Sequence, residues 1–271
     1  LSDGQVLVIA PGRSLGALET AWLLRIGGCT ADVTIVEAQG LPFWYNEAGS
    51  VLTLTSAAPM AAATLPSGRS ETLNALKKYL PNLVVFDSVL ASGFSDGSAL
   101  VEVPTLMMGG PALHGGAIPI PMGGKLLEGN QTFASLIGSS QKTIIAKLTD
   151  ERHKVAKAFG VRHLPSASEM ISTYGGSLRG DHSRPIPSQK MSKSLLRCGV
   201  IGSLVPLKSA GQIANLKVPV TSAIITLASS ILGADVSAAG RRLEAIGIDS
   251  GDIDTARRAM DAIATGEKYG R

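Results

Sequence analysis

The segment that most constrains the fold lies at the start of the chain, where residues 5–28 read QVLVIAPGRSLGALETAWLLRIGG. A short apolar strand runs into a Gly-rich turn. Apolar side chains then recur at helical spacing from Leu15 to Ile26, and Gly27-Gly28 ends the predicted helix. A strand, a tight turn and a helix in this order are typical of an α/β sheet domain.

The turn resembles the phosphate-binding fingerprint G-x-G-x-x-G, in which the glycines make the turn, admit the pyrophosphate and let the helix pack on the strand. Gly12 and Gly16 supply the first and last glycines, but Ser14 stands where the middle one is required. Glu37 follows the next strand, about 20 residues on, where a ribose-binding acid would sit. Two interpretations therefore stay open: a phosphate cradle, or a strand–helix–strand unit elsewhere in the same kind of sheet.

Composition bounds the protein class. The chain has 271 residues, of which 45% are hydrophobic and 17% charged, so it is globular rather than disordered. A net charge of +4 mildly favours small anionic ligands and does not indicate nucleic acid. Cys29 and Cys198 show no metal or redox spacing, so we expect no metal site and a reducing, cytoplasmic location. We expect no membrane span, and the apolar stretch from Val218 is interpreted as a core helix.

The chain has two kinds of organisation. Residues 1–98 alternate strand and helix patterns, with strands predicted at residues 5–10, 33–36, 51–56 and 82–86. Residues 99–271 carry helix signals almost throughout. The predicted fold class is α/β plus all-α: the second half of a Rossmann-like parallel sheet domain, followed by a helical bundle.

The helical part has readable helix ends. Thr149 is predicted to cap a helix that stops at Gly160, and Ser166 with Glu169 forms a capping box. Further helices are predicted near residues 203–216, 219–233, 237–247 and 254–266.

The order of the segments resembles the octopine/nopaline (opine) dehydrogenase family over nearly the whole chain. GQVLVIAPGRSLGALETAWLLRIGGCTADVTIVEAQGLPF is similar to the second half of that family's Rossmann domain. LTDERHKVAKAFGVRHLPSASEMI is similar to the start of its helical domain, and the segment from SLVPLKSAGQIANL to LEAIGI is similar to its end. The chain begins at Leu1 without Met, so we expect it to be truncated at its N-terminal side.

The resemblance implies NAD or NADP as cofactor of the full-length protein. The family's pyrophosphate loop would lie upstream of this chain, which alone should bind NAD(P) weakly or not at all. The turn after the first strand would lie near the nicotinamide instead. The residues implied there are Gly12, Arg13, Glu37, Leu41 and Pro42.

The resemblance also implies a catalytic His oriented by an Asp, and both are replaced here. Glu102 stands where the His is expected, and Cys198-Gly199 stand where the Asp is expected. Glu102 could donate a proton if burial kept it neutral, or it could be a carboxylate facing a helix dipole. His114, in a Gly/Pro-rich loop, is the next candidate for catalysis.

Other candidate groups have two interpretations each. The basic cluster around Arg184 could bind anions or form a solvated loop; its members are Arg179, Arg184, Lys190, Lys193 and Arg197. Trp44 and Tyr45 could stack on a planar ligand or belong to the core.

Three functions remain in competition. The first is an NAD(P)-dependent reductase that acts on the imine of an amino acid and an α-keto acid, with a small anionic substrate and a homodimer expected. The second is a relative that kept the fold as a binding or assembly protein. The third is a non-redox enzyme that reuses the pocket.

Overall fold

The structure is a computed structural model. It describes residues 1–41, 43–48, 50–57, 59–109, 132–175, 184, 186–248 and 252–267, with the backbone alone for residues 43–48 and 52–57.

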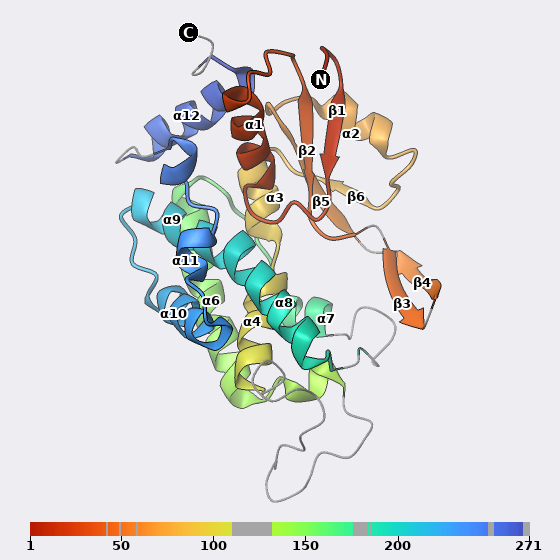
Figure 1. Ribbon diagram of the computed structural model, residues 1–271, viewed down its shortest axis with the longest axis vertical. Coiled ribbons are helices and arrows are strands. Elements are labelled where there is room, and N and C mark those ends of the chain that lie inside the picture. The colour runs from red at the N-terminus through yellow and green to blue at the C-terminus, as the bar shows by residue number, and fades with distance from the viewer. Residues whose placement is uncertain are drawn as a thin grey trace, which may run out of the picture.

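A four-stranded sheet, in the order β1-β2-β5-β6, forms one end of the molecule (Figure 1). Its strands are β1 (Val6–Ile9), β2 (Thr34–Ala38), β5 (Met60–Leu65) and β6 (Leu83–Val85). β1 is parallel to β2 and β5 is parallel to β6, but β5 is antiparallel to β2. The sheet is therefore mixed, where the sequence predicted a parallel one.

The connection between β2 and β5 explains this pairing. It carries a two-stranded hairpin, β3 (Phe43–Ala48) and β4 (Val51–Ala57), and no helix among its described residues. Neighbouring parallel strands need a long crossover, usually a helix. Without one, β5 returns antiparallel to β2. The sequence did not predict β3 or β5 as strands.

Three helices accompany the strands. They are α1 (Gly16–Ile26), α2 (Ser70–Leu76) and α3 (Val89–Ser95). The buried residues of α1 include Ala17, Leu18 and Ala21, a spacing that turns one face of the helix inward. α1 packs against β2, and α3 packs against β2 and β5.

The rest of the chain is helical. Its elements are α4 (Ser98–Met108), η1 (Phe133–Leu136), α6 (Ser139–Ala158), α7 (Ala167–Gly175), α8 (Gln189–Gly199), the π-helical turn η3 (Val200–Leu204), α9 (Val205–Ile213), α10 (Pro219–Leu232), α11 (Val236–Ala239), η4 (Glu244–Ile246) and α12 (Ile253–Thr265). α4 lies at the centre of this part and packs against α6, α7, α8 and η3. Every residue of α4 from Ala99 to Met107 is buried, as expected of a helix that is apolar on nearly all sides.

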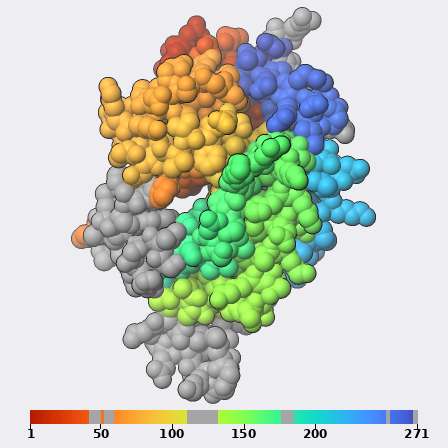
Figure 2. Space-filling view, turned by 180° about the vertical axis from the view of Figure 1, so that it is seen from behind, coloured from red at the N-terminus to blue at the C-terminus, as the bar shows by residue number. Residues whose placement is uncertain are grey.

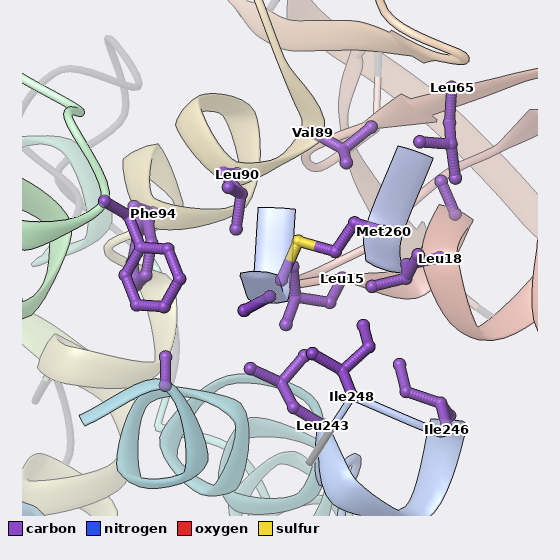
Figure 3. Packing of buried hydrophobic residues seen from close by; sticks show 14 of the residues in the cluster. Leu15, Leu18, Leu65, Val89, Leu90, Phe94, Leu243, Ile246, Ile248 and Met260 are labelled. Atoms are coloured by element: carbon purple, nitrogen blue, oxygen red, sulfur yellow. The ribbon is translucent and has the colours of Figure 1, made fainter. Parts of the chain in front are cut away.

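The two parts share a hydrophobic core (Figure 3). Leu15 and Leu18 of the sheet part lie in one buried cluster with Phe159, Leu243 and Met260 of the helical part. The predicted fold class is confirmed, since no β-strand follows Val85 among the described residues. The domain boundary at residue 98 stays a prediction.

Helix ends were predicted with mixed success. The capping box is confirmed: the Ser166 backbone N–H donates to Glu169 Oε2 at 2.7 Å, and the Glu169 N–H donates to Ser166 Oγ at 3.3 Å. The Thr149 cap is wrong, because α6 begins ten residues earlier, at Ser139. The Thr149 hydroxyl instead donates to the Ile145 carbonyl inside the helix, at 2.7 Å. The helix predicted at 237–247 is broken into α11 and η4.

No single described helix is long and apolar enough to cross a membrane. One pair of segments joined by a bend of 108°, Pro219–Leu232 and Val236–Ile246, is long and apolar enough only when the two are taken together. Within α10, Thr221, Ile224, Ile225 and Ala228 are buried in the fold.

Candidate functional site

The turn between β1 and α1 lies at the carboxyl end of β1, which points toward the helical part (Figure 1). In open α/β sheets, ligands bind beyond the carboxyl ends of the strands. Two non-glycine residues of the turn adopt the left-handed region, Arg13 with φ 51° and Leu15 with φ 66°. Such a conformation is uncommon for side-chain-bearing residues and is often retained at functional positions.

Glu37, at the end of β2, fills the space beneath this turn. Its side chain is fully buried, and a Cβ on Gly12 would lie 2.5 Å from Glu37 Cγ. Gly12 is therefore required by the close approach of this carboxyl group, which differs from the role that the fingerprint assigns to its glycines. The Gly12 N–H donates to the Ala38 carbonyl at 2.8 Å, which fixes the turn on β2.

The carboxyl group of Glu37 accepts hydrogen bonds from α1, from Gln39 just after β2, and from α3. Oε2 accepts from the Ala17 N–H at 2.9 Å, and Oε1 accepts from Gln39 Nε2 at 2.9 Å and from Ser92 Oγ at 3.3 Å. The N-cap residue of α1, Leu15, offers no side-chain cap, so Glu37 supplies the acceptor that the helix start lacks. Burial raises the pKa of Glu37 to about 8, against the hydrogen bond from Ala17 and the charge of Arg241, which lower it.

These contacts decide whether the β1–α1 turn can be a phosphate cradle. A phosphate at the N-terminus of α1 would need the same backbone N–H that Glu37 already occupies. The α1 N-terminus therefore does not fit a pyrophosphate, and in this conformation Glu37 offers no surface to a ligand.

Arg241 of the helical part closes the turn from outside. Its Nε donates to Glu19 Oε2 at 2.7 Å, and its Nη1 donates to the carbonyl oxygen of Ser14. Two backbone hydrogen bonds add to this contact: Ser14 N–H to the Gly202 carbonyl at 3.0 Å, and Arg241 N–H to the Ile201 carbonyl at 3.2 Å. The turn is thus bonded to η3, a π-helical turn, which is a feature often found at functional sites.

The Arg13 side chain extends across the junction between the two parts of the protein. Its stem lies over Gly202, where a Cβ would meet Arg13 Cδ at 2.8 Å. Arg13 Nη1 donates to Ser98 Oγ at 3.2 Å and lies 3.8 Å from Asp96 Oδ2. The side chain is 18% exposed.

Asp96, in the loop between α3 and α4, is the carboxylate at the centre of this junction. Its Oδ1 accepts from the Ser98 N–H at 3.0 Å and its Oδ2 from Ser203 Oγ at 3.4 Å. It also faces Arg152 of α6, whose Nη1 and Nη2 donate to the carbonyls of Phe94 and Pro165 at 3.0 and 2.6 Å. Burial lowers the pKa of Arg152 to about 10, and the charge of Asp96 opposes that shift. Asp96, Arg13 and Arg152 are called the junction cluster below.

Tyr174 of α7 borders the junction cluster. Burial and the negative charge of Asp96 raise the pKa of its hydroxyl. Tyr174 therefore remains neutral at physiological pH and leaves the charge balance of the cluster unchanged.

Glu102 lies further along α4 and is buried, with a cation beside it. Arg184 Nη2 donates to Glu102 Oε1 at 2.7 Å, and Arg184 Nη1 donates to the Tyr174 carbonyl at 2.8 Å. The guanidinium carbon also lies 4.0 Å from the centre of the Phe133 ring. Such a geometry pairs an arginine cation with a carboxylate. Glu102 lies beyond the first turn of α4, so it is not the helix-start carboxylate that one interpretation expected. To donate a proton to a substrate it would first have to separate from Arg184.

The surface is hollowed next to this region. Figure 2 shows a gap between the orange-to-yellow surface of the sheet part and the green surface of the helical part. Among the described residues, no group of three or more His, Cys, Asp or Glu side chains could hold a metal ion.

Known proteins resemble this chain in sequence and in fold. No protein-family profile matches the chain. An opine dehydrogenase from Arthrobacter sp. (strain 1C) is 28% identical over 262 residues, which span 92% of this chain and 69% of that protein. The chain is a relative of the opine dehydrogenases.

Solved structures of opine dehydrogenases share its fold. Octopine dehydrogenase in complex with NADH and agmatine superposes with a TM-score of 0.65 at 15% identity, covering 98% of this chain and 72% of that one. Yersinopine dehydrogenase superposes with a TM-score of 0.62 at 11% identity, covering 97% and 72%.

The predicted site residues of this opine dehydrogenase relative fall into separate places. Gly12, Arg13 and Glu37 meet in the turn, whereas Leu41 lies in the exposed loop after β2. Glu102 lies on α4 with Arg184. Pro42 and His114 lie outside the described residues, as does Arg179 of the basic cluster. Lys190, Lys193 and Arg197 are exposed on α8, in agreement with a solvated surface.

Sequence reasoning missed Asp96 and Arg152. Arg152 lies within the helix predicted from Thr149 to Gly160, and helical spacing puts it on the same face as Leu148 and Val155, which are both buried. Asp96 had a weaker signal, since Asp-Gly-Ser before an apolar run is also an ordinary way to begin a helix.

Proposed function

We propose that the full-length protein is an NAD(P)-dependent oxidoreductase of the opine type, which condenses an amino acid with an α-keto acid and reduces the imine. The observation that carries the proposal is the similarity to a curated opine dehydrogenase over 92% of the chain. NADH or NADPH would supply the hydride.

The geometry of the junction supports this proposal. The carboxyl end of β1 points at the helical part, and charged groups from the turn, from the loop before α4 and from α6 gather there. A substrate with carboxylates would meet arginine donors at this place, and guanidinium groups bind carboxylates well. These residues would bind and orient the substrate. We assign no cofactor phosphate to the α1 N-terminus, because Glu37 fills it.

A specific observation favours a second candidate, a relative that kept the fold and lost redox chemistry. The His153 ring at the junction lies beside Arg152 Nη2 and the Pro165 carbonyl, at 3.3 and 3.1 Å, rather than beside a carboxylate, and Glu102, the predicted replacement, is held by Arg184. Such a protein would bind the same class of anions without turnover, as a binding or assembly protein or with a different chemistry.

Turnover decides between the two candidates. The full-length protein should consume NADH or NADPH when it is given pairs from a panel of amino acids and a panel of α-keto acids. The loss of nicotinamide absorbance measures this consumption. The control omits the amino acid, which separates imine reduction from reduction of the keto acid. Binding of keto acids or nicotinamide cofactor without consumption would favour the non-redox relative.

Glu102→Gln tests the proposed acid in the same assay. Loss of a general acid lowers turnover by about 10²- to 10⁴-fold. Cofactor affinity should stay almost unchanged. An unchanged turnover would leave Glu102 as a partner of Arg184 alone, with His114 the next candidate.

A cytoplasmic location and a homodimer are further proposals, which fractionation and sedimentation would test.

A further inference from the structure

The charges of the junction cluster do not balance. Arg13 and Arg152 both face Asp96, so two cations share one carboxylate. The neighbouring pairs are each complete: Glu102 has Arg184, and Arg241 has Glu19. Burial raises the pKa of Glu37 to about 8, which favours its neutral form near pH 7. Among the described residues, one positive charge at the junction therefore lacks a counter-charge.

Buried charges are normally paired, so an uncompensated cation in a largely buried place indicates a missing anion. Asp96 is 8% exposed and Arg152 is 2% exposed. The Nε of Arg152 is buried and has no hydrogen-bond partner among the described residues. This polar atom is a second sign that the set of acceptors here is incomplete.

Arg13 is the member of the cluster that a ligand can reach. It is 18% exposed, whereas the two carbonyls of Phe94 and Pro165 bind the guanidinium of Arg152. Of the five N–H donors of Arg13, the contacts found among described residues involve Nη1 alone, at 3.2 Å from Ser98 Oγ and 3.8 Å from Asp96. The guanidinium is held in place without being saturated.

The backbone also holds Arg13 at the junction. Its left-handed conformation, the hydrogen bond from Gln39 Nε2 to its carbonyl at 2.8 Å and the bare Gly202 beneath its stem direct the side chain across the gap between the two parts. A side chain at position 202 would displace it.

We infer that Arg13 is the anion-binding and specificity-determining residue of this site, and that it binds a carboxylate or phosphate oxygen of the ligand with Asp96 as its positioning residue. The inference rests on the proposed function for the identity of the ligand. The shared chemistry is an oxyanion, which either the keto acid substrate or the nicotinamide cofactor can supply.

The first test is steady-state kinetics of the full-length protein with Arg13→Gln. Loss of a charged hydrogen bond should raise the KM of the reactant that carries the anion about 10- to 100-fold. A rise for the keto acid or the amino acid identifies a substrate carboxylate, and a rise for NADH or NADPH identifies the cofactor. Arg258→Gln removes a cation from the exposed face of α12 and is the matched control. KM values within twofold of the wild type for all reactants would overturn the inference.

Gly202→Ala tests the same idea without removing the charge. Its Cβ would lie 2.8 Å from Arg13 Cδ, so the guanidinium should move and the same KM should rise, by less than in Arg13→Gln. Arg13→Lys should rescue part of the affinity, since it retains the charge and loses the fork of donors. A KM that rises equally for all reactants would point to general distortion and would contradict the inference.

Calorimetric titration separates this inference from the proposed function, because it requires no turnover. The probes are pyruvate, 2-oxoglutarate, NADH and inorganic phosphate, each added to the wild type, Arg13→Gln and Arg258→Gln. Binding that is lost only in Arg13→Gln supports the anion site even if the protein proves to be no oxidoreductase. Absence of binding by the wild type, or equal binding by all three proteins, would overturn it.

Discussion

Two ionisable side chains at the β1–α1 turn have opposite environments. Glu37, beneath the turn, is fully buried and accepts hydrogen bonds from Ala17, Gln39 and Ser92. The Arg13 side chain, above it, is partly exposed, and among the described residues it makes one hydrogen bond, to Ser98 Oγ at 3.2 Å. Glu37 supplies acceptors that the folded backbone needs, whereas Arg13 keeps N–H donors available for a ligand.

This difference shows how a turn can keep the shape of a phosphate-binding loop and bind no phosphate there. The backbone N–H groups at a helix start require an acceptor, and a carboxyl group from the adjacent strand meets the requirement as well as a ligand does. Ligand binding then has to come from side chains that point away from the turn, as Arg13 does. The comparison predicts that substitutions in the first environment change stability and that Arg13 substitutions change binding.

The largest expected effect is that of Asp96→Asn. The amide can still accept from the Ser98 N–H, but Arg13 and Arg152 would face no carboxylate. Removing one partner of a buried charged group typically costs about 3–5 kcal/mol. Urea unfolding measures the loss. Asp252→Asn, at the exposed N-cap of α12, is the matched control, because Asn caps a helix as well as Asp does. Equal losses in both variants would show that Asp96 does not hold the cluster together.

Glu37→Gln should change how stability depends on pH. The folded-state pKa of Glu37 is raised from 4.5 to about 8. Between these values the unfolded chain releases the proton and the folded protein keeps it. Stability therefore falls as the pH rises, by up to about 1.4 kcal/mol per pH unit, and levels off above the folded pKa.

The Gln side chain resembles the neutral acid and has no proton to lose, so this slope should disappear. The variant should then gain on the wild type as the pH rises from 4.5 to about 8, as followed by urea unfolding at a series of pH values. Glu71→Gln, on the exposed first turn of α2, is the control. Parallel pH profiles for wild type and Glu37→Gln would mean that Glu37 is ionised in the folded state.

Gly12→Ala should destabilise the turn, because its Cβ would overlap Glu37 Cγ at 2.5 Å. Overpacking of this kind costs about 1–3 kcal/mol. Gly16→Ala tests the same turn four residues on, where the nearest atom to a Cβ is Arg241 Nη2 at 3.6 Å. The second variant should be neutral or slightly stabilising, measured by thermal unfolding. A tolerated Gly12→Ala would show that Glu37 can move out of the space beneath the turn.

Local sequence signals predicted much of the fold. The end of α1 at Ile26, the Ser166–Glu169 capping box and the bounds of α10 all follow from spacing and capping residues. The antiparallel return of β5 did not follow, since MAAATL is not a strong strand pattern and its pairing depends on β2 across a long connection.

The site was less accessible to sequence reasoning than the fold. Gly12, Arg13 and Glu37 were found because one short motif brings them together. The junction cluster needs Asp96 and Arg152 to meet Arg13 from different elements, and no local pattern encodes such a meeting. The ion pair of Glu102 was missed for the same reason, because Arg184 lies 82 residues away in the sequence.

Arg13→Gln is expected to change stability only slightly, and it tests the comparison between Glu37 and Arg13 most directly. If Arg13 carries the surplus charge, its removal leaves Arg152 and Asp96 as a balanced pair, and unfolding free energy should change by less than about 1 kcal/mol. Combined with Asp96→Asn, the same substitution should recover part of the stability that the single Asp96→Asn variant loses, since one unpaired guanidinium is gone. The coupling between such neighbours is typically about 0.5–3 kcal/mol, which a double-mutant cycle by urea unfolding resolves. A loss in Arg13→Gln as large as in Asp96→Asn would mean that the two residues form a structural pair. Arg13 would then have no charge left for a ligand, and the contrast with Glu37 would fail.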